Sequence, residues 1–300
     1  MTQNIYIGVD GGGTQSKIRI EDESGNLIDK ITSGPANIRL SIDESFKNIF
    51  AALDEALSSK NLRLNDPQYA FHAGFGLAGY EVKEARSRFL AKPHPFKTLA
   101  TTSDSHVACL GAHKGKDGAI LIVGTGAVGY QILNGKGMKV GGFGFPCDDD
   151  GSGAWLGMQA VKLAFQWLDS RLEKSPLAVD VYAYFNNDFD KLITFANQAT
   201  STEFAKLAPL VINHAQQEEI AAVRLMKKAA HFIDRINHGL IKQRDTEKFP
   251  TALTGGISPF IEPWLNEKLR ESIVSHNSDA ASGAILFVKE YIQSKALLSE

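Results

Sequence analysis

The chain has 300 residues, which exceeds the usual size of one domain, so we expect two lobes. Hydrophobic residues make up 43% and charged residues 22%, as in a folded protein with an ample core. The net charge of −2 argues against nucleic acid as a partner. Two cysteines are too few for a disulfide framework and are typical of a reducing cytoplasm. No signal peptide is evident, and glycines break the longest apolar stretch, so we expect a cytoplasmic protein without a membrane partner.

The first lobe is predicted over residues 1–114. Alternating apolar residues predict strands, and apolar residues at helical spacing predict helices. A serine at position 41 is a good cap for the first of these helices. The expected strands cover 4–9, 16–21, 27–33, 69–77 and 96–102, and the expected helices cover 41–59, 81–90 and 106–113.

The second lobe is predicted over residues 115–300, and it begins with the same pattern as the first. A strand, a Gly/Thr turn and returning strands recur about 115 residues on, which indicates an internal duplication. Helices with weak strand character follow over 175–222. The other expected strands cover 118–124, 127–133, 137–140, 249–253 and 272–275, and the other helices cover 154–173, 217–243, 259–269 and 280–294.

A glycine-rich turn follows the first strand, in the sequence Gly8-Val-Asp-Gly-Gly-Gly-Thr14. Three consecutive glycines mark a place where the backbone turns tightly or approaches a ligand closely. The turn matches neither the dinucleotide-binding pattern G-x-G-x-x-G nor the P-loop pattern. A plain tight hairpin is the alternative to a ligand loop.

Eight separated loops, in order along nearly the whole chain, resemble those of the N-acetylglucosamine kinases and bacterial glucosamine kinases. These belong to the superfamily of the benzoyl-CoA reductase activator ATPases, the BadF/BadG/BcrA/BcrD type. The loops are Gly8-Val-Asp-Gly-Gly-Gly-Thr14, Gly34-Pro-Ala-Asn37, Gly76-Leu-Ala-Gly79, Ser103-Asp104, Gly124-Thr-Gly126, Gly141-Gly-Phe-Gly144, Asp149-Asp-Gly-Ser-Gly153 and Leu253-Thr-Gly-Gly-Ile257. The resemblance implies a two-lobe α/β fold of the actin-like, hexokinase type (ribonuclease H-like), with internal duplication.

The resemblance also implies an activity: ATP-dependent phosphorylation of N-acetylglucosamine or glucosamine at the 6-hydroxyl, with Mg²⁺, by a chain that forms a homodimer. Asp10 would bind Mg²⁺ through water, since Mg²⁺ keeps its hydration shell where few carboxylates are offered. The residues implied to bind the ATP phosphates are Gly11, Gly12, Gly13, Thr14, Lys17, Gly124, Thr125 and Gly126, and those at the adenine are Gly255, Gly256 and Ile257.

Asp104 is the candidate general base, because a carboxylate at the C-terminal end of a strand can accept the proton of an attacking sugar hydroxyl. Since Ser103, Asp104 and Ser105 are all good helix caps, the spacing alone favours a cap, and the resemblance favours the base. For the sugar, the resemblance implies Asn37, Asp104, Gly126, Ala127, Phe143, Gly144 and Asp149.

One loop departs from the family pattern Gly-Asp-Glu-Gly-Ser, because Asp148 stands at its Gly and Asp150 at its Glu. These acids could instead favour the start of the following helix through its dipole. Phe143 argues for an acetylated sugar, whereas the two extra acids argue for a free amine.

The rival function is that of an activator or sensor ATPase of the same superfamily, which couples ATP hydrolysis to a partner protein. A kinase for a different small polyol or for an anhydro-sugar is a third alternative. The activator ATPases hold an iron–sulfur cluster through a cysteine in a glycine-rich loop, whereas Cys109 lies in an apolar helix.

Overall fold

The computed structural model describes residues 2–244, 249–275 and 278–297. Its contacts divide into two compact units. Unit 1 contains residues 1–118, 132–137 and 275–300, and unit 2 contains residues 119–131 and 138–274. The sequence-based boundary at 114/115 assigned the last helix to the second lobe, whereas these contacts group it with the first.

Unit 1 is built on a five-stranded sheet in the order β3-β2-β1-β4-β5. β1 and β2 are antiparallel, as are β2 and β3, and β4 and β5 continue the sheet parallel to β1. Alternating residues of β1, such as Ile5, Ile7 and Val9, are buried on one face. The strands are β1 (Gln3–Gly11), β2 (Ser16–Asp22), β3 (Leu27–Ser33), β4 (Tyr69–Leu77) and β5 (Thr98–Ser103).

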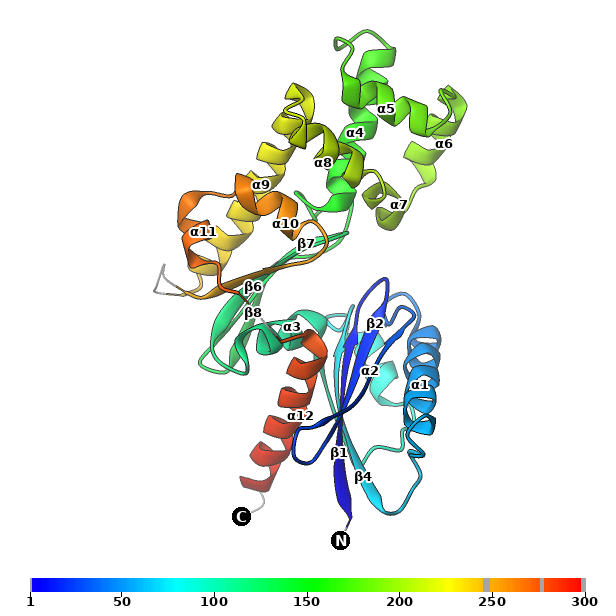
Figure 1. Ribbon diagram of the computed structural model, residues 1–300, viewed down its shortest axis with the longest axis vertical. Helices are drawn as coiled ribbons and strands as arrows, with labels where there is room; N and C mark the ends of the chain where they lie inside the picture. The colour runs from blue at the N-terminus through cyan, green and yellow to red at the C-terminus, as the bar shows by residue number, and fades with distance from the viewer. Residues whose placement is uncertain (1, 245–248, 276–277, 298–300) are drawn as a thin grey trace. The chain divides into compact units, whose positions relative to one another are not determined.

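Helices cover both faces of this sheet (Figure 1). α1 (Ile42–Ser58) adds Ile49 and Leu53 to the core on one face, and its cap is Ser41, as the sequence predicts. α3 (Asp104–His113) and α12 (Ala280–Leu297) pack on the other, and α2 is Lys83–Leu90.

α12 lies very close to the sheet because glycines face it. A Cβ on Gly8 would overlap the carbonyl oxygen of Ala281, and a Cβ on Gly74 would overlap that of Ala284. The helix backbone therefore rests directly on β1 and β4.

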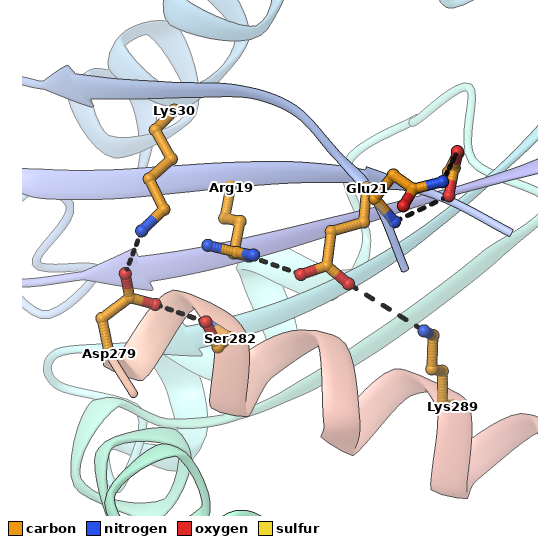
Figure 2. Close-up of polar contacts among 8 residues, drawn as sticks. Arg19, Glu21, Lys30, Asp279, Ser282 and Lys289 are labelled. Atoms are coloured by element: carbon orange, nitrogen blue, oxygen red, sulfur yellow. Dashed lines mark hydrogen bonds and ion pairs between the residues drawn. The ribbon is translucent and has the colours of Figure 1, made fainter. Parts of the chain in front are cut away.

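Polar contacts at the edge of this packing join α12 to β2 and β3 (Figure 2). The Lys30 ammonium lies 2.9 Å from the Asp279 carboxylate, which also accepts from the backbone N–H and hydroxyl of Ser282. Further along the helix, Glu21 lies between Arg19 and Lys289. Asp279 thus acts as the cap of α12 and as its ionic tie to β3.

Unit 2 is built on a four-stranded sheet in the order β8-β7-β6-β9. Its first three strands are joined by short turns, and β9 continues the sheet parallel to β6. This repeats the order β3-β2-β1-β4 of unit 1, as an internal duplication requires. The strands are β6 (Gly118–Val123), β7 (Ala127–Leu133), β8 (Lys136–Gly141) and β9 (Thr251–Thr254).

Helices make up the rest of unit 2. The long amphipathic α9 carries a buried stripe that includes Met226, Ile233 and Leu240. In chain order the helices are α4 (Gly153–Leu168), α5 (Pro176–Tyr184), α6 (Phe189–Gln198), α7 (Ser201–Ala205), α8 (Ala208–Gln216), α9 (Ile220–Ile241), α10 (Ser258–Ile261), the 3₁₀ helix η1 (Glu262–Trp264) and α11 (Glu267–Ser272).

Four sequence-based expectations in this unit differ from the structure. The helix predicted to reach 173 ends at Leu168, and Ser170 takes a left-handed φ of 64°. The helices expected over 175–222 are present as α5 to α8, but the weak strand character expected there is not found. The helix predicted over 259–269 is three short pieces, because Pro263 cannot continue an α-helix, and the strand predicted over 272–275 is one bridge between Thr251 and Ile273.

Among the helices of the described residues, none is both long and apolar enough to cross a membrane.

Candidate functional site

In unit 1, the glycine-rich turn joins β1 to β2. Gly11 pairs with Ser16 as the last register pair, which leaves residues 12–15 as the loop of the hairpin. Gly13 and Thr14 are exposed, and Lys17 lies beside Asp10 on the neighbouring strand. The turn predicted between the first two strands is confirmed, and its backbone at Gly13 and the Thr14 side chain are exposed to solvent.

Two other loops of unit 1 are hydrogen-bonded to this turn. The N–H of Ala36 donates to the carbonyl oxygen of Gly12, and the N–H of Ala78 donates to that of Gly11. The Asn37 side chain lies between Gly79 and the glycine-rich turn, because a Cβ on Gly79 would meet its Oδ1 and one on Gly13 would lie 3.8 Å from its Nδ2. The structure therefore brings the candidate sugar residue Asn37 next to the candidate phosphate loop.

Asp10 lies at the end of β1 among charged groups. Burial raises the pKa of Asp10 to about 7; the negative charges of Asp104 and Asp279 add to this, and the Lys17 ammonium opposes it. A carboxylate whose charged form is disfavoured in this way is stabilised by a nearby cation. Among the described residues, no group of three or more His, Cys, Asp or Glu side chains could hold a metal ion directly, so a cation at Asp10 would have to be held through water.

Asp104 is the first residue of α3, at the end of β5. The cap of this helix is Ser103, whose hydroxyl accepts the N–H of His106 at 3.2 Å. The Asp104 carboxylate accepts the N–H of Ser105 at 2.7 Å. Since Ser103 performs the capping, the alternative reading of Asp104 as the cap is wrong, and its carboxylate stands in the first turn near Asp10.

In unit 2, the second Gly/Thr turn lies between β6 and β7, at the start of α4. The N–H of Gly153 donates to the carbonyl oxygen of Gly124 at 2.8 Å, and the N–H of Ala154 donates to that of Thr125 at 3.1 Å. Ser152 caps α4 through the N–H of Trp155. These bonds fix the turn against the first residues of the helix.

Asp149 is attached to the same turn. Its Oδ1 accepts the N–H of Ala127 at 3.2 Å, and a Cβ on Gly126 would come within 3.0 Å of its carboxylate. Burial raises the pKa of Asp149, and the charge of Asp148 adds to this, whereas N–H donors and Lys139 oppose it. The sugar candidates Gly126, Ala127 and Asp149 are therefore in one place.

Phe143 and Gly144 lie in the segment 141–152, which we call the aromatic loop. Phe143 is 76% exposed, and its backbone N–H donates to the Asp148 carboxylate at 2.8 Å. The Lys139 ammonium lies 5.5 Å from the centre of the Phe143 ring and donates to the carbonyl oxygen of Gly142. Asp148 therefore holds the loop, while Asp150 is exposed. Capping of α4 by this acidic run is not observed, because Ser152 is the cap.

The candidate adenine loop follows β9. Gly255 has a φ of 103°, and a Cβ on it would overlap the backbone of Val123. The N–H of Ile257 donates to the carbonyl oxygen of Val123 at 3.0 Å, whereas Gly256 has open space around its Cβ position. This loop therefore runs along the end of β6, beside the second Gly/Thr turn.

Sequence reasoning missed two features of these sites. Asp279 was not singled out, although Asp279-Ala-Ala-Ser282 before an apolar run is the pattern of a helix cap. The contact between Phe145 of the aromatic loop and Phe204 of α7, with ring centres 5.4 Å apart, has no local signal in the sequence.

Comparisons with known proteins find relatives that are named as kinases of amino sugars. The chain is 34% identical to glucosamine kinase GspK of Vibrio cholerae over 95% of each chain. It is 24% identical to the N-acetylmuramic acid/N-acetylglucosamine kinase of Clostridium acetobutylicum, over 94% of this chain and 97% of that one. The crystal structure of a candidate N-acetylglucosamine kinase from Chromobacterium violaceum superposes with a TM-score of 0.88 and 31% identity, covering 95% of this chain and 98% of the other.

A more distant structure bears on the fold alone. The ROK family glucokinase of Streptomyces griseus, solved with glucose and AMPPNP, gives a TM-score of 0.57 at 15% identity, over 95% of this chain and 98% of that one. The predicted two-lobe fold of the actin-like, hexokinase type is thereby confirmed. A family model described as the BadF/BadG/BcrA/BcrD ATPase family matches residues 7–288. Because this match covers nearly the whole chain, the chain belongs to the BadF/BadG/BcrA/BcrD ATPase family.

Proposed function

We propose that this chain is an ATP-dependent amino-sugar kinase that transfers the γ-phosphoryl group of ATP to the 6-hydroxyl of N-acetylglucosamine, with glucosamine as the alternative substrate. The observation that carries the proposal is the position of Asp104: a carboxylate that does not cap its helix, at the end of a strand, near Asp10. The kinase names of the relatives over nearly full length support the same reaction.

In the proposed reaction, Asp104 accepts the proton of the 6-hydroxyl as that oxygen attacks the γ-phosphorus, and ADP leaves. Phosphoryl transfer needs positioning and charge neutralisation more than covalent work by the protein. The backbone N–H groups of residues 11–14 and 124–126 would bind the phosphates. Asp10 would hold Mg²⁺ through water, and the ion would neutralise charge on the phosphates. Residues 255–257 would contact the adenine.

For the sugar, we propose Asn37 in unit 1 and Gly126, Ala127, Phe143, Gly144 and Asp149 in unit 2. The aromatic loop helps to decide which group the sugar carries at its 2-position, an acetamido group or a free amine. One oxygen of Asp148 already accepts the Phe143 N–H, and the Lys139 ammonium lies beside the Phe143 ring. A cation at this position repels an ammonium group and tolerates a neutral acetamido group. We therefore place the acetylated sugar first.

The first test is ADP release with Mg-ATP in the presence of N-acetylglucosamine, glucosamine, N-acetylmannosamine, glucose or no sugar. The proposal requires a large and selective rise with one amino sugar. Turnover that is indifferent to every sugar would contradict it and would favour the partner-activating ATPase. Sedimentation of the purified protein tests the homodimer that we propose alongside the activity.

The role of Asp104 has its own test in Asp104→Asn. Loss of a general base lowers kcat by about 10² to 10⁴-fold. Asn keeps the size of the side chain and an oxygen for the Ser105 N–H, so the fold should be retained. Ser103→Ala is the matched control, because it removes the cap of α3 and leaves the carboxylate. Activity of Asp104→Asn within a few-fold of the unmodified protein would exclude Asp104 as the base.

A further inference from the structure

A short helix of unit 2, α7, contacts the aromatic loop through one buried ring. Phe204 of α7 is 5% exposed, and its ring centre lies 5.4 Å from that of Phe145, at an angle of 47° between the planes. Phe145 is two residues from the exposed Phe143 and four from Asp149. The contact therefore reaches the part of the loop in which the proposed sugar residues lie.

Two further rings continue the contact into the helices behind α7. The ring centre of Phe195 on α6 lies 5.1 Å from that of Phe204, and Phe185, next to the end of α5, lies 4.9 Å from Phe195. Aromatic pairs at these distances are attractive beyond the area that they bury. The four rings thus form a continuous series of contacts from the end of α5 to the aromatic loop.

α7 also packs on the start of α4. A Cβ on Gly157 would overlap the carbonyl oxygen of Phe204, and one on Gly153 would lie 3.4 Å from the Cβ of Ala205. Gly153 is the residue whose N–H holds Gly124 of the second Gly/Thr turn. Helix α7 therefore contacts both the aromatic loop and Gly153, the residue that is hydrogen-bonded to the second Gly/Thr turn.

The N-terminal end of α7 is fixed by hydrogen bonds of its own side chains. Thr200 accepts the N–H of Glu203, and the Glu203 carboxylate accepts the N–H of Thr200, which is a complete capping box. A helix of five residues has little stability of its own, so this box and the packing on α4 hold it in place. Phe204 therefore presents a fixed surface to the loop.

The aromatic loop contains several glycines, whose backbone can adopt many conformations, so packing against a fixed residue such as Phe204 would restrict it. Gly141, Gly142 and Gly144 have φ values of 70°, 72° and 107°, a region that glycine enters freely. The bonds from Asp148 to Phe143 and from Lys139 to Gly142 restrain the first half of the loop. Phe145 follows these residues, and its ring is the half-buried apolar group of the loop that packs on Phe204.

We propose that Phe204 is a positioning residue, which holds the aromatic loop in its sugar-binding conformation through its contact with Phe145. This inference rests on the proposed function for the identity of the ligand, and on the geometry of unit 2 for the contact. Helices α5 to α7 then act on the sugar end of the site, although none of their residues is among the proposed ligands.

The test compares Phe204→Leu, Phe145→Leu and the double variant with the unmodified protein. Phe165→Leu is the matched control: its ring packs on Phe189 of α6 at 6.1 Å, away from the loop. We expect Phe204→Leu and Phe145→Leu each to raise the KM for the sugar about tenfold, with kcat and the KM for ATP within about twofold, as for a loss of binding alone. The double variant should raise the KM for the sugar little further, because each single variant already removes the contact between the two rings.

Hydrogen exchange of the unliganded protein gives a readout that does not depend on the sugar. Amides of residues 141–152 should exchange faster in Phe204→Leu than in the unmodified protein or in Phe165→Leu. Unchanged exchange of the loop, or equal effects of the control, would overturn the inference. Faster exchange in a protein that no sugar stimulates would uphold the positioning role and overturn the proposed function. Should Phe204→Leu fail to fold, Phe145→Leu carries the same comparisons.

Discussion

The charge of Asp279 should stabilise unit 1, and Asp279→Asn isolates that charge. Asparagine caps helices about as well as aspartate, so the variant keeps the hydrogen bonds to Ser282 and loses the ion pair with Lys30. Burial acts to raise the pKa of Asp279, but the hydrogen bonds from Ser282 and Lys30 outweigh it and hold the pKa at about 2. The ionised form is therefore the one that the fold favours.

The size of the effect follows from that pKa. The ordinary value is 3.8, so the difference is about 1.8 units, or about 2.4 kcal/mol at about 1.36 kcal/mol per unit. The Asp279 side chain is 36% exposed, so solvent screens the interaction and we reduce the figure to about 1 kcal/mol. Because the folded pKa lies below the unfolded one, this contribution is complete above about pH 4 and is lost as the pH falls through 2.

Urea unfolding at pH 7 and pH 3 measures the contribution of the Asp279 charge to the free energy of unfolding, with far-UV circular dichroism as the main probe. All three tryptophans, Trp155, Trp167 and Trp264, belong to unit 2, so tryptophan fluorescence follows that unit and serves as an internal control. We expect Asp279→Asn to lower the free energy of unfolding of unit 1 by about 1 kcal/mol at pH 7 and by roughly half as much at pH 3.

Lys30→Met is the matched variant, since it removes the partner and leaves the cap. Lys30→Met and Asp279→Asn should be less than additive when combined, because both remove one ion pair. An Asp279→Asn protein as stable as the unmodified one at pH 7, or a loss that stays constant into acid, would refute the reasoning.

Three other outcomes follow from the geometry. Gly126→Ala should weaken sugar binding measured by KM, because a Cβ there would press on the Asp149 carboxylate; an unchanged KM would mean that Asp149 moves aside freely. Gly256→Ala should leave the thermal midpoint within about 2 °C, since nothing lies near its Cβ position, and should raise the KM for ATP if the adenine occupies that space. A thiol reagent should label the exposed Cys147 in the folded protein and Cys109 only on unfolding, because burial raises the pKa of the Cys109 thiol to about 12; rapid labelling of both would contradict this.

Much of the fold could be predicted because its signals are local. The alternation of Ile5, Ile7 and Val9 predicts β1, and the serine before α1 predicts where that helix starts. The expectation of strand character over 175–222 failed for a physical reason. Residues such as Val181 and Tyr182 have strand propensity, but here they pack on neighbouring helices, and tertiary packing overrides propensity.

The candidate site was predictable only where its parts lie in short loops. The glycine turns were visible in the sequence, and the structure places Asn37 beside the first and Asp149 beside the second. Other contacts of unit 1 join distant residues: Lys30 and Asp279 are 249 positions apart. Such pairs leave no periodic or local pattern, so only the folded chain could reveal them.

The grouping of α12 with unit 1 has a consequence for the order in which the molecule is made. On the ribosome, β1 and β4 emerge early, but the helix that covers Gly8 and Gly74 is synthesised only after residues 119–274. Domains usually fold as they are completed, from the N-terminus onward. Here unit 2 has its full sequence first, and one face of the unit 1 sheet stays uncovered until α12 arrives. The segment made earliest is therefore among the last to reach its final packing.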